Sequence, residues 1–416
     1  MLNSKNEREL AYLITVDAIE PIPGKDRVEC AVVGGWRTMV KKDVFKPGDI
    51  GIYIEIDSKT PEKEPFDFLE KYHYKVKTQK FKTFYSQGLL MAPEDFGWRT
   101  TEIVDFDDVH RIGVWNEKDS EAYYPNDDSR FLTSQLGITY ATAEDNKRKT
   151  SSPDKYKKMA QRHPELFKKK WARWMMKRTW GKKVMFFFFG KKKDKRTWPA
   201  WVVKTDEERI ENLPHLFNEK CAWFATEKVD GSSTTFTMKR GSGFHKPTYL
   251  VCSRNVCFDT PEKADKCFYD SNIYLEMSEK YHIQDVLEKM LKEDDTLDFV
   301  TIQGETYGEG VQKKTYKKTG HDLAIFNVIF GYKDNTTKRL NPREMTDLMN
   351  QYELPCVPII DENYILPDTI EELRAFVNSE PSKIDGEIKE GIVFRSPDGA
   401  ASFKCVSPEF LLQYHC

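Results

Sequence analysis

A lysine at the end of a predicted strand is the residue best suited to covalent chemistry. Residues 225–229 read as a strand, Gly231 permits a turn, and residues 234–238 resume an alternating extended pattern. Lys228 therefore ends a strand, with Asp230 two positions later. A free amine is nearly all ammonium at neutral pH, so a nucleophile here requires burial or nearby cations that lower its pKa. The pattern predicts a lysine that attacks phosphorus, although Lys-x-Asp-Gly also occurs in ordinary surface turns.

Further motifs follow Lys228, and most of them are predicted strands with a charged residue at or near one end. The segments are residues 299–305, 323–330, 387–395 and 402–406, together with the turn after residue 252. The residues that they carry in order are Arg254, Asn255, Glu305, Phe326, Glu390 and Lys404. Each motif alone is explained by a strand with a charged end. Their joint order is much less expected by chance and indicates one active site.

The composition indicates a protein with two or three domains and reduced thiols. The chain has 416 residues, and its eight cysteines are scattered without a C-x-x-C pair. No apolar run has membrane length, and the N-terminus does not read as a secretory signal. We therefore expect an intracellular location, cytoplasmic or nuclear.

The net charge of −2 conceals one strongly basic segment. Residues 147–196 hold 20 Lys plus Arg against 3 Asp plus Glu. Within it, Phe167, Trp171, Trp174 and Met175 have helical spacing, which predicts an apolar docking face with lysines around it. Phosphate groups of a nucleic acid are the expected partner. A nuclear-localisation signal and a solvated linker remain alternatives.

The first part of the chain reads as a small β-barrel. Residues 10–18, 27–33, 36–40 and 50–56 are β-rich runs separated by Gly and Pro turns. We expect domains at 1–97 and 197–416, with residues 98–196 as an acidic and then basic connector. A basic strip with interleaved aromatics is predicted to bind RNA, namely Lys77, Lys80, Phe81, Lys82, Phe84 and Tyr85.

Three helices are predicted in the second part of the chain. Thr205 followed by Glu208 reads as a capping box that starts a helix. Residues 281–292 show helical periodicity, and residues 364–379 contain a helix that begins near residues 368–369.

Several stretches resemble one family. Residues 18–27, 45–49 and 53–58 resemble an OB-type domain found ahead of some RNA ligases, and residues 203–214 resemble the entry to their catalytic domain. With the ordered motifs, the chain resembles the covalent nucleotidyltransferase superfamily of ligases and mRNA-capping enzymes, and more narrowly the ATP-dependent RNA ligases of the Naegleria type. The resemblance implies an α+β fold. An N-terminal OB-type β-barrel is followed by a mixed, mainly antiparallel, ATP-grasp-like nucleotidyltransferase domain.

The resemblance also implies roles for the motif residues. Lys228 would attack the α-phosphate of ATP and become lysyl-AMP, and Lys404 would contact that phosphate. Glu227, Glu305 and Phe326 would bind the nucleotide, with Glu305 at the ribose hydroxyls and Phe326 stacked on adenine. The RNA end would meet Arg254 and Asn255. Asp230 and Glu390 would hold Mg²⁺ or Mn²⁺ through water.

The implied function is ATP-dependent joining of RNA 3′-hydroxyl and 5′-phosphate ends by a monomer, on substrates that include a nicked or splinted duplex. One departure concerns Val406, where many relatives carry a second lysine after Lys404. A catalytically inactive RNA-binding relative is therefore an alternative. A capping guanylyltransferase is a weaker one, because only 12 residues follow Lys404 and leave no room for its further domain.

Overall fold

The computed structural model describes residues 1, 3–4, 8–81, 84–104, 110–140, 169–176, 178, 181, 185, 198–241, 246–259, 269, 271–314 and 316–415. The chain divides into two compact units. One joins Met1–Tyr140 to Trp198–Cys416, and the other is Ala141–Thr197. No helix in these described ranges is long and apolar enough to cross a membrane.

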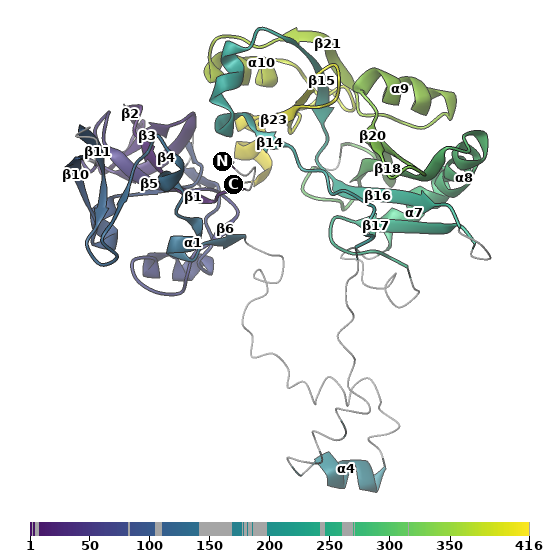
Figure 1. The fold of residues 1–416 in the computed structure, drawn as a ribbon, viewed down its shortest axis with the longest axis horizontal. Helices are drawn as coiled ribbons and strands as arrows, with labels where there is room; N and C mark the ends of the chain where they lie inside the picture. Colours follow the sequence, from purple (N-terminus) through teal and green to yellow (C-terminus); the bar gives the residue numbers. More distant parts are fainter. Residues whose placement is uncertain are drawn as a thin grey trace. The chain divides into compact units, whose positions relative to one another are not determined.

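The predicted N-terminal strands are confirmed (Figure 1). One antiparallel sheet contains β2 (Ala18–Pro21), β3 (Val28–Val33) and β4 (Trp36–Lys41). A second contains β1 (Ala11–Thr15), β5 (Ile50–Ile54) and β9 (Leu89–Met91). The described strands therefore pair as separate small sheets and not as one closed barrel.

Residues 98–104 and 110–140 are folded, so the prediction that the connector begins at residue 98 was wrong. They form β10 (Arg99–Val104), β11 (His110–Asn116), β12 (Glu121–Tyr123), α1 (Thr133–Leu136) and β13 (Thr139–Tyr140). Strand β13 pairs with β6 (Ser58–Lys59). Trp98, Val114 and Leu132 are buried in the same core cluster as Leu13 and Ile52. This shared core makes the segment part of the N-terminal domain.

The predicted basic strip is partly packed inside the protein. Phe84 in β8 (Phe84–Ser86) is buried and cannot stack on a base. Lys80 in β7 (Gln79–Phe81) donates a hydrogen bond to the Leu412 carbonyl of the C-terminal π-helical segment η7 (Leu411–His415). Lys82 lies outside the described residues. The strip is therefore not an open aromatic platform.

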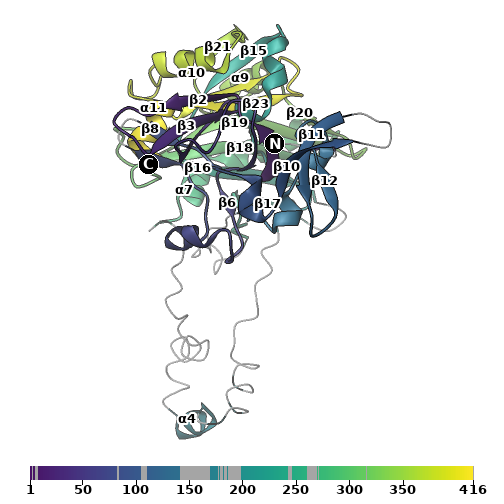
Figure 2. The same ribbon diagram turned by 90° about the vertical axis from the view of Figure 1, so that its left-hand side faces the viewer.

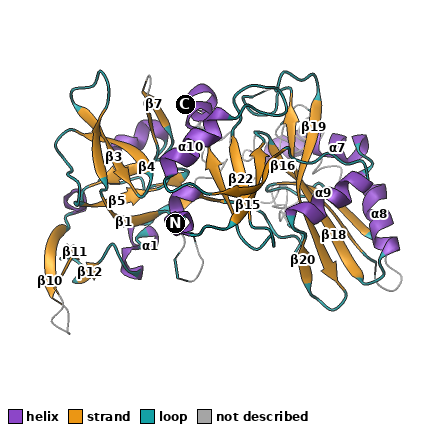
Figure 3. Cartoon of the chain, turned by 90° about the horizontal axis from the view of Figure 1, so that it is seen from above, coloured by secondary structure: helices purple, strands orange, loops and turns teal. Residues whose placement is uncertain are grey.

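Two five-stranded sheets form the C-terminal part (Figures 1 and 3). The first has the order β14 (Glu208–Arg209), β23 (Ser402–Val406), β22 (Gly391–Arg395), β15 (Ala222–Lys228) and β21 (Ile359–Ile365). The second has the order β17 (Thr248–Ser253), β16 (Ser232–Lys239), β18 (Leu297–Gly308), β19 (His321–Tyr332) and β20 (Thr337–Arg339). All neighbouring pairs are antiparallel except β14 with β23. The predicted mainly antiparallel α+β fold is confirmed.

Helices lie against these sheets (Figures 1 and 2) and bury apolar side chains on them. Helices α7 (Ile273–Lys280), α8 (Ile283–Glu293) and α9 (Pro342–Gln351) pack on the second sheet. Helix α8 buries Ile283, Leu287 and Met290, which confirms the predicted periodicity. Helix α10 (Ile370–Ser379) covers the first sheet and starts with the capping box of Thr369 and Glu372.

The helix predicted from Thr205 is absent, because the Thr205 hydroxyl bonds to tertiary partners instead of capping. It donates to the Gln303 side chain and accepts from Asn327 Nδ2 at 3.2 Å. Residues 203–207 are irregular, and Glu208 begins strand β14.

The unit Ala141–Thr197 has one described helix, α4 (Lys170–Met176). Its Trp171 and Trp174 are half exposed, and the Arg178 guanidinium lies 3.7 Å from the Trp174 ring centre. The predictions for Phe167 and for most of residues 147–196 fall outside the described residues.

Hydrogen bonds around a buried ion pair of the C-terminal part join it to the N-terminal domain. Arg374 of α10 donates to the Gly35 carbonyl at 2.7 Å and to Glu211 at 2.9 Å. Trp36 Nε1 donates to Asn212 Oδ1 at 3.3 Å. Arg374 and Glu211 are both buried, so each depends on the other for its charge partner.

We predict that Arg374→Ala lowers the free energy of unfolding by about 3–5 kcal/mol, because it leaves Glu211 buried without its cation. The matched control is Arg343→Ala, whose exposed pair with Glu362 at 3.1 Å is expected to contribute less than about 1 kcal/mol. Urea denaturation measures both variants. Equal, small losses for the two would contradict the prediction.

Candidate functional site

The first C-terminal sheet places the predicted residues in two parallel rows. Lys228 pairs with Gly391, which pairs with Val406. Two residues earlier on the same strand, Thr226 pairs with Val393, which pairs with Lys404. Residues directly opposite each other in an antiparallel sheet point to the same face. Lys228 and Lys404 therefore share one face two strands apart.

Close approach explains two glycines at this face. A Cβ on Gly391 would lie 2.3 Å from the Cys405 carbonyl oxygen, so no side chain fits between Lys228 and Val406. A Cβ on Gly231 would lie 2.4 Å from the Thr306 carbonyl oxygen. Gly231 therefore allows β16 to approach β18 directly after the lysine strand.

A cavity of about 260 Å³ opens at this face. It receives side chains from both sheets and from the irregular stretch before β14. The lining residues are Thr205, Asp206, Glu207, Thr226, Glu227, Lys228, Val229, Gly231, Ser232, Ser233, Arg254, Glu305, Gln312, Phe326, Val357, Val393, Arg395 and Lys404. The structure thus brings most of the predicted motif residues to one hollow.

Lys228 forms a close ion pair inside this cavity. Its Nζ lies 2.6 Å from Glu390 Oε1. Burial by itself lowers the pKa of Lys228. The carboxylates of Glu390, Glu305 and Asp230 raise this pKa by more than burial lowers it, so it lies above its usual value. The described side chains therefore do not by themselves lower this pKa, and its lowering by a neighbouring metal cation stays a prediction. A nucleophilic role for this amine would require these carboxylates to be neutralised.

Glu305 is the carboxyl group most affected by this environment. It lies on β18 opposite Ser233 of β16. Burial raises the pKa of Glu305 to about 8, with Lys228 lowering it and Glu390 and Asp230 raising it. At neutral pH the group is largely protonated, so it can both donate to and accept from hydroxyl groups.

Asp230 lies beside this group on the turn after β15. Its backbone N–H donates to Tyr316 Oη at 2.5 Å, and its side chain is buried. Tyr316 packs edge-on against Tyr307, with ring centres 5.0 Å apart. These contacts fix the turn that carries Asp230 next to Lys228.

Asp206 holds two cations at the other side of the cavity. Its carboxylate accepts from Lys404 Nζ at 3.0 Å and from Arg254 Nη2 at 2.6 Å. Burial raises the pKa of Asp206, but these two cations outweigh burial and lower it to about 2. Burial lowers the pKa of Lys404, assisted by Arg209 and Lys228 and opposed by Asp206. Lys404 and Arg254 are thereby held as neighbouring groups that suit phosphate oxygens.

Phe326 provides an aromatic surface backed by a buried cation. The Arg395 guanidinium carbon lies 5.9 Å from the Phe326 ring centre. Arg395 donates to Glu207 Oε1 at 2.9 Å, and Glu207 also accepts from Arg339 at 3.4 Å. This network fixes the wall of the cavity at Phe326.

Two predicted residues are engaged elsewhere. The Glu227 carboxylate accepts from Ser382 Oγ at 2.5 Å and from the Lys383 N–H at 2.8 Å, on the opposite face of β15 from Lys228. Asn255 Oδ1 accepts from Lys204 Nζ at 3.4 Å. The Glu227 side chain therefore stabilises the sheet and does not reach the Lys228 cluster.

Sequence reasoning gave no role to Asp206, Glu207 and Arg395. Asp206 and Glu207 lie in the Thr-Asp-Glu-Glu run that reads as a helix cap, and Arg395 ends the strand that begins after Glu390. Only the pairing of charges across the fold identifies them. The alternation along β22 does place Arg395 on the same face as Val393.

The residues present fit a hydrated divalent cation better than a directly bound one. Among the described residues, no group of three or more His, Cys, Asp and Glu side chains has the arrangement of a metal cage. Asp230 and Glu390 nevertheless flank Lys228 with acidic oxygens. Mg²⁺ keeps several of its waters and binds through a few carboxylates plus substrate phosphates, which suits this arrangement.

Comparisons with known proteins match two regions of the chain to family models. Residues 222–406 match the family model described as RNA ligase, and residues 10–93 match that of an OB-fold domain. No curated protein matches the chain significantly.

Solved structures of the Naegleria gruberi RNA ligase have a similar fold. A mutant with AMP and Mn shares 23% identity and a TM-score of 0.64, covering 98% of this chain and 99% of that chain. A mutant with ATP and Mn shares 24% sequence identity and has a TM-score of 0.64, and the match again covers 98% of this chain and 99% of that chain. The ligase with PPi shares 24% sequence identity and has a TM-score of 0.63, covering 97% of this chain and 98% of that chain.

We predict that Glu305→Gln flattens the pH dependence of stability. The folded-state pKa of Glu305 is raised, so the folded protein binds more protons than the unfolded chain between about pH 4.5 and pH 8. This contribution to stability is complete below that window and is lost as pH rises through it. The free energy of unfolding of the variant should fall less across the window. Glu288→Gln, on the exposed side of α8, is the control, and identical slopes for all three proteins would contradict the prediction.

Proposed function

We propose that this chain, whose residues 222–406 belong to the RNA ligase family and whose residues 10–93 form an OB-fold domain, is an ATP-dependent RNA ligase. The observation that carries the proposal is the position of Lys228. It lies in a cavity between an acidic cluster and the cation pair of Lys404 and Arg254. A nucleophilic amine, sites for divalent cation and phosphate, and an aromatic wall occur together there.

The first step is attack of Lys228 Nζ on the α-phosphate of ATP. The Lys228 ammonium first gives its proton to solvent water. The neutral amine then forms a phosphoramidate bond to the α-phosphorus as the bond to pyrophosphate breaks and pyrophosphate leaves. Asp230 and Glu390 would hold Mg²⁺ or Mn²⁺, which neutralises phosphate charge and weakens the stabilisation of the Lys228 ammonium. Burial, the largest effect on this pKa, then favours the neutral amine.

The other residues bind and orient the nucleotide. Lys404 donates to the α-phosphate after exchanging its contact with Asp206. Phe326 stacks on the adenine, and Glu305 binds the ribose hydroxyls in its protonated form at neutral pH. Since the Glu227 carboxylate is already bound to Ser382 and Lys383, Glu227 contributes through its backbone.

The RNA substrate binds next to this cluster. Arg254 is 59% exposed and receives the 5′-phosphate, while Asn255 and Lys204 beside it interact with the adjoining chain. The AMP passes from Lys228 to the 5′-phosphate, and a 3′-hydroxyl then displaces it to close the strand. None of the described cysteines is in a disulfide bond, which supports an intracellular enzyme.

Val406 does not prevent this chemistry in the proposal. It is buried and lies in the Lys228 row across Gly391, whereas Lys404 lies in the next row. Lys404, Arg254 and Arg395 supply three cationic side chains around the cavity. The lost second lysine is therefore offset by existing charge.

We predict that Lys228→Ala lowers joining of 5′-phosphorylated RNA with ATP by more than roughly 10³-fold, because no covalent intermediate can form. The variant should still join RNA that already carries AMP on its 5′-phosphate. Gel separation of labelled RNA measures both reactions.

The matched control is Lys220→Ala, an exposed lysine paired with Asp368 outside the cavity. It should keep both activities. Loss of joining of the pre-adenylylated RNA in Lys228→Ala, with Lys220→Ala active, would contradict the assigned role.

A further inference from the structure

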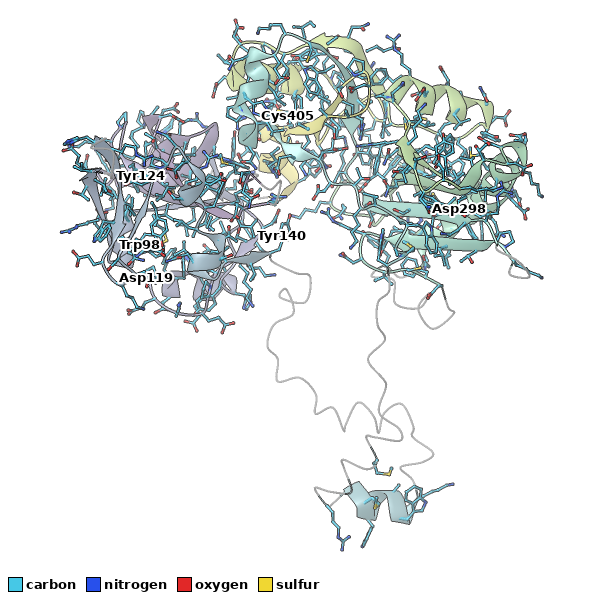
Figure 4. All side chains as sticks on the ribbon, viewed as in Figure 1. Trp98, Asp119, Tyr124, Tyr140, Asp298 and Cys405 are labelled. Carbon is cyan, nitrogen blue, oxygen red and sulfur yellow. The ribbon has the colours of Figure 1, made fainter. Side chains whose placement is uncertain are left out.

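Two loops, one from each C-terminal sheet, meet at a buried lysine. Residues 309–320 connect β18 to β19 of the second sheet, and residues 380–390 lead from α10 into β22 of the first sheet. In Figure 4, Asp298 marks β18, and Cys405 marks β23, the neighbour of β22. Contacts between these loops therefore connect the two sheets.

Lys314 joins the two loops. Its Nζ lies 3.2 Å from Asp385 Oδ1 and donates to the Ile388 carbonyl at 2.7 Å. The same Nζ lies 4.3 Å from the ring centre of Tyr316, two residues along its own loop. The side chains of Lys314 and Asp385 are each 2% exposed, so solvent ions screen this pair little. One ammonium group thus holds groups of both loops in place.

The contacts of Lys314 lead to both carboxylates that would hold the metal in the proposed function. Tyr316 Oη accepts from the Asp230 N–H at 2.5 Å, so the Lys314 loop holds the turn that carries Asp230. In the other loop, Glu390 follows Ile388 by two residues, and its carboxylate pairs with the Lys228 amine. A continuous series of contacts through Lys314 therefore links Asp230 to the segment of Glu390.

Stability alone does not account for a lysine at this position. Apolar side chains of similar volume can often replace a buried ion pair without loss of stability. A buried ammonium group supplies something different, because its charge-assisted hydrogen bonds fix a carboxylate and a carbonyl at set distances. A cation that keeps its waters and is held by few carboxylates depends on the spacing of those carboxylates.

We propose that Lys314 is a positioning residue that sets the separation of Asp230 and Glu390 and thereby the affinity of the site for its divalent cation. The inference rests on the proposed function and deepens it, because it names the residue on which metal binding beside Lys228 depends. An ammonium group has no lone pair to offer a metal, so Lys314 acts through the two carboxylates and not as a ligand.

The test uses the double variant Lys314→Met/Asp385→Asn. Lys314→Met alone would leave Asp385 buried without its cation and can unfold the protein, whereas the double variant removes both charges. The matched control is Lys317→Met, because Lys317 pairs with Glu387 between the same two loops but is 67% exposed. Electron paramagnetic resonance measures free Mn²⁺ in solutions of protein saturated with AMP, and Glu390→Ala identifies the signal of this site.

The double variant should bind Mn²⁺ about 10- to 100-fold more weakly than wild type, the usual cost of losing a residue that orients metal ligands. Lys317→Met should bind Mn²⁺ as wild type does. At saturating ATP, the Mn²⁺ concentration for half-maximal AMP attachment should rise by the same factor in the double variant, and excess Mn²⁺ should restore most of the rate. A merely structural role would lower the folded fraction, which circular dichroism reports, and leave the metal dependence of the folded protein unchanged.

Each failure has a distinct signature. If wild type neither attaches AMP nor shows Mn²⁺ binding that Glu390→Ala removes, the proposed function itself fails. If wild type does both and the folded double variant keeps the wild-type Mn²⁺ affinity and metal dependence, the inference about Lys314 alone is wrong. An equal loss of affinity in Lys317→Met would also overturn it, because any contact between the two loops, and not the buried cation, would then set the spacing.

Discussion

The ion pair between Lys228 and Glu390 is the interaction on which the site depends. The end of β15 and the residue before β22 bring these side chains to 2.6 Å in a partly buried position, where each charge stabilises the other. The same contact that stabilises Lys228 also keeps it protonated and unreactive. In the proposed function, chemistry at Lys228 requires a change of charge at these carboxylates, which the substrate phosphates and the metal would supply.

The cations on the far side of the cavity are likewise held by a carboxylate. Lys404 and Arg254 share Asp206 in the absence of ligand, which avoids two unpaired positive charges near Lys228. Incoming phosphate groups can replace this carboxylate without creating a buried unpaired charge. The site is thus assembled before the substrate arrives, and binding exchanges one set of charge partners for another.

Much of this could be predicted from the sequence because the motif residues lie at strand ends. Strand periodicity located β15, β16, β18, β19, β22 and β23, and antiparallel pairing then brings Lys228, Glu390 and Lys404 together. The direction of the Lys228 pKa could not be predicted, because it depends on a distance across the sheet. The engagement of Glu227 was missed because only the fold places Ser382 and Lys383 behind β15.

The errors in the fold also have physical causes. Strands β10 and β11 are largely exposed, so residues 98–140 show little hydrophobic periodicity although Trp98 and Val114 enter the core. Thr205 carries a valid capping pattern, but its hydroxyl binds Gln303 and Asn327, and tertiary bonds override the local preference. The contact of Arg374 with Gly35 and Glu211 joins residues far apart in the chain, and local patterns contain no sign of it.

The most direct test of the account is to find where the nucleotide becomes attached. The protein would be mixed with Mg²⁺ or Mn²⁺ and either ATP or GTP labelled at the α-phosphate, denatured, digested, and its peptides analysed by mass spectrometry. The account predicts label from ATP and not GTP, on the peptide that contains Lys228. Label from GTP, label on a different lysine, or no label from either nucleotide would contradict it.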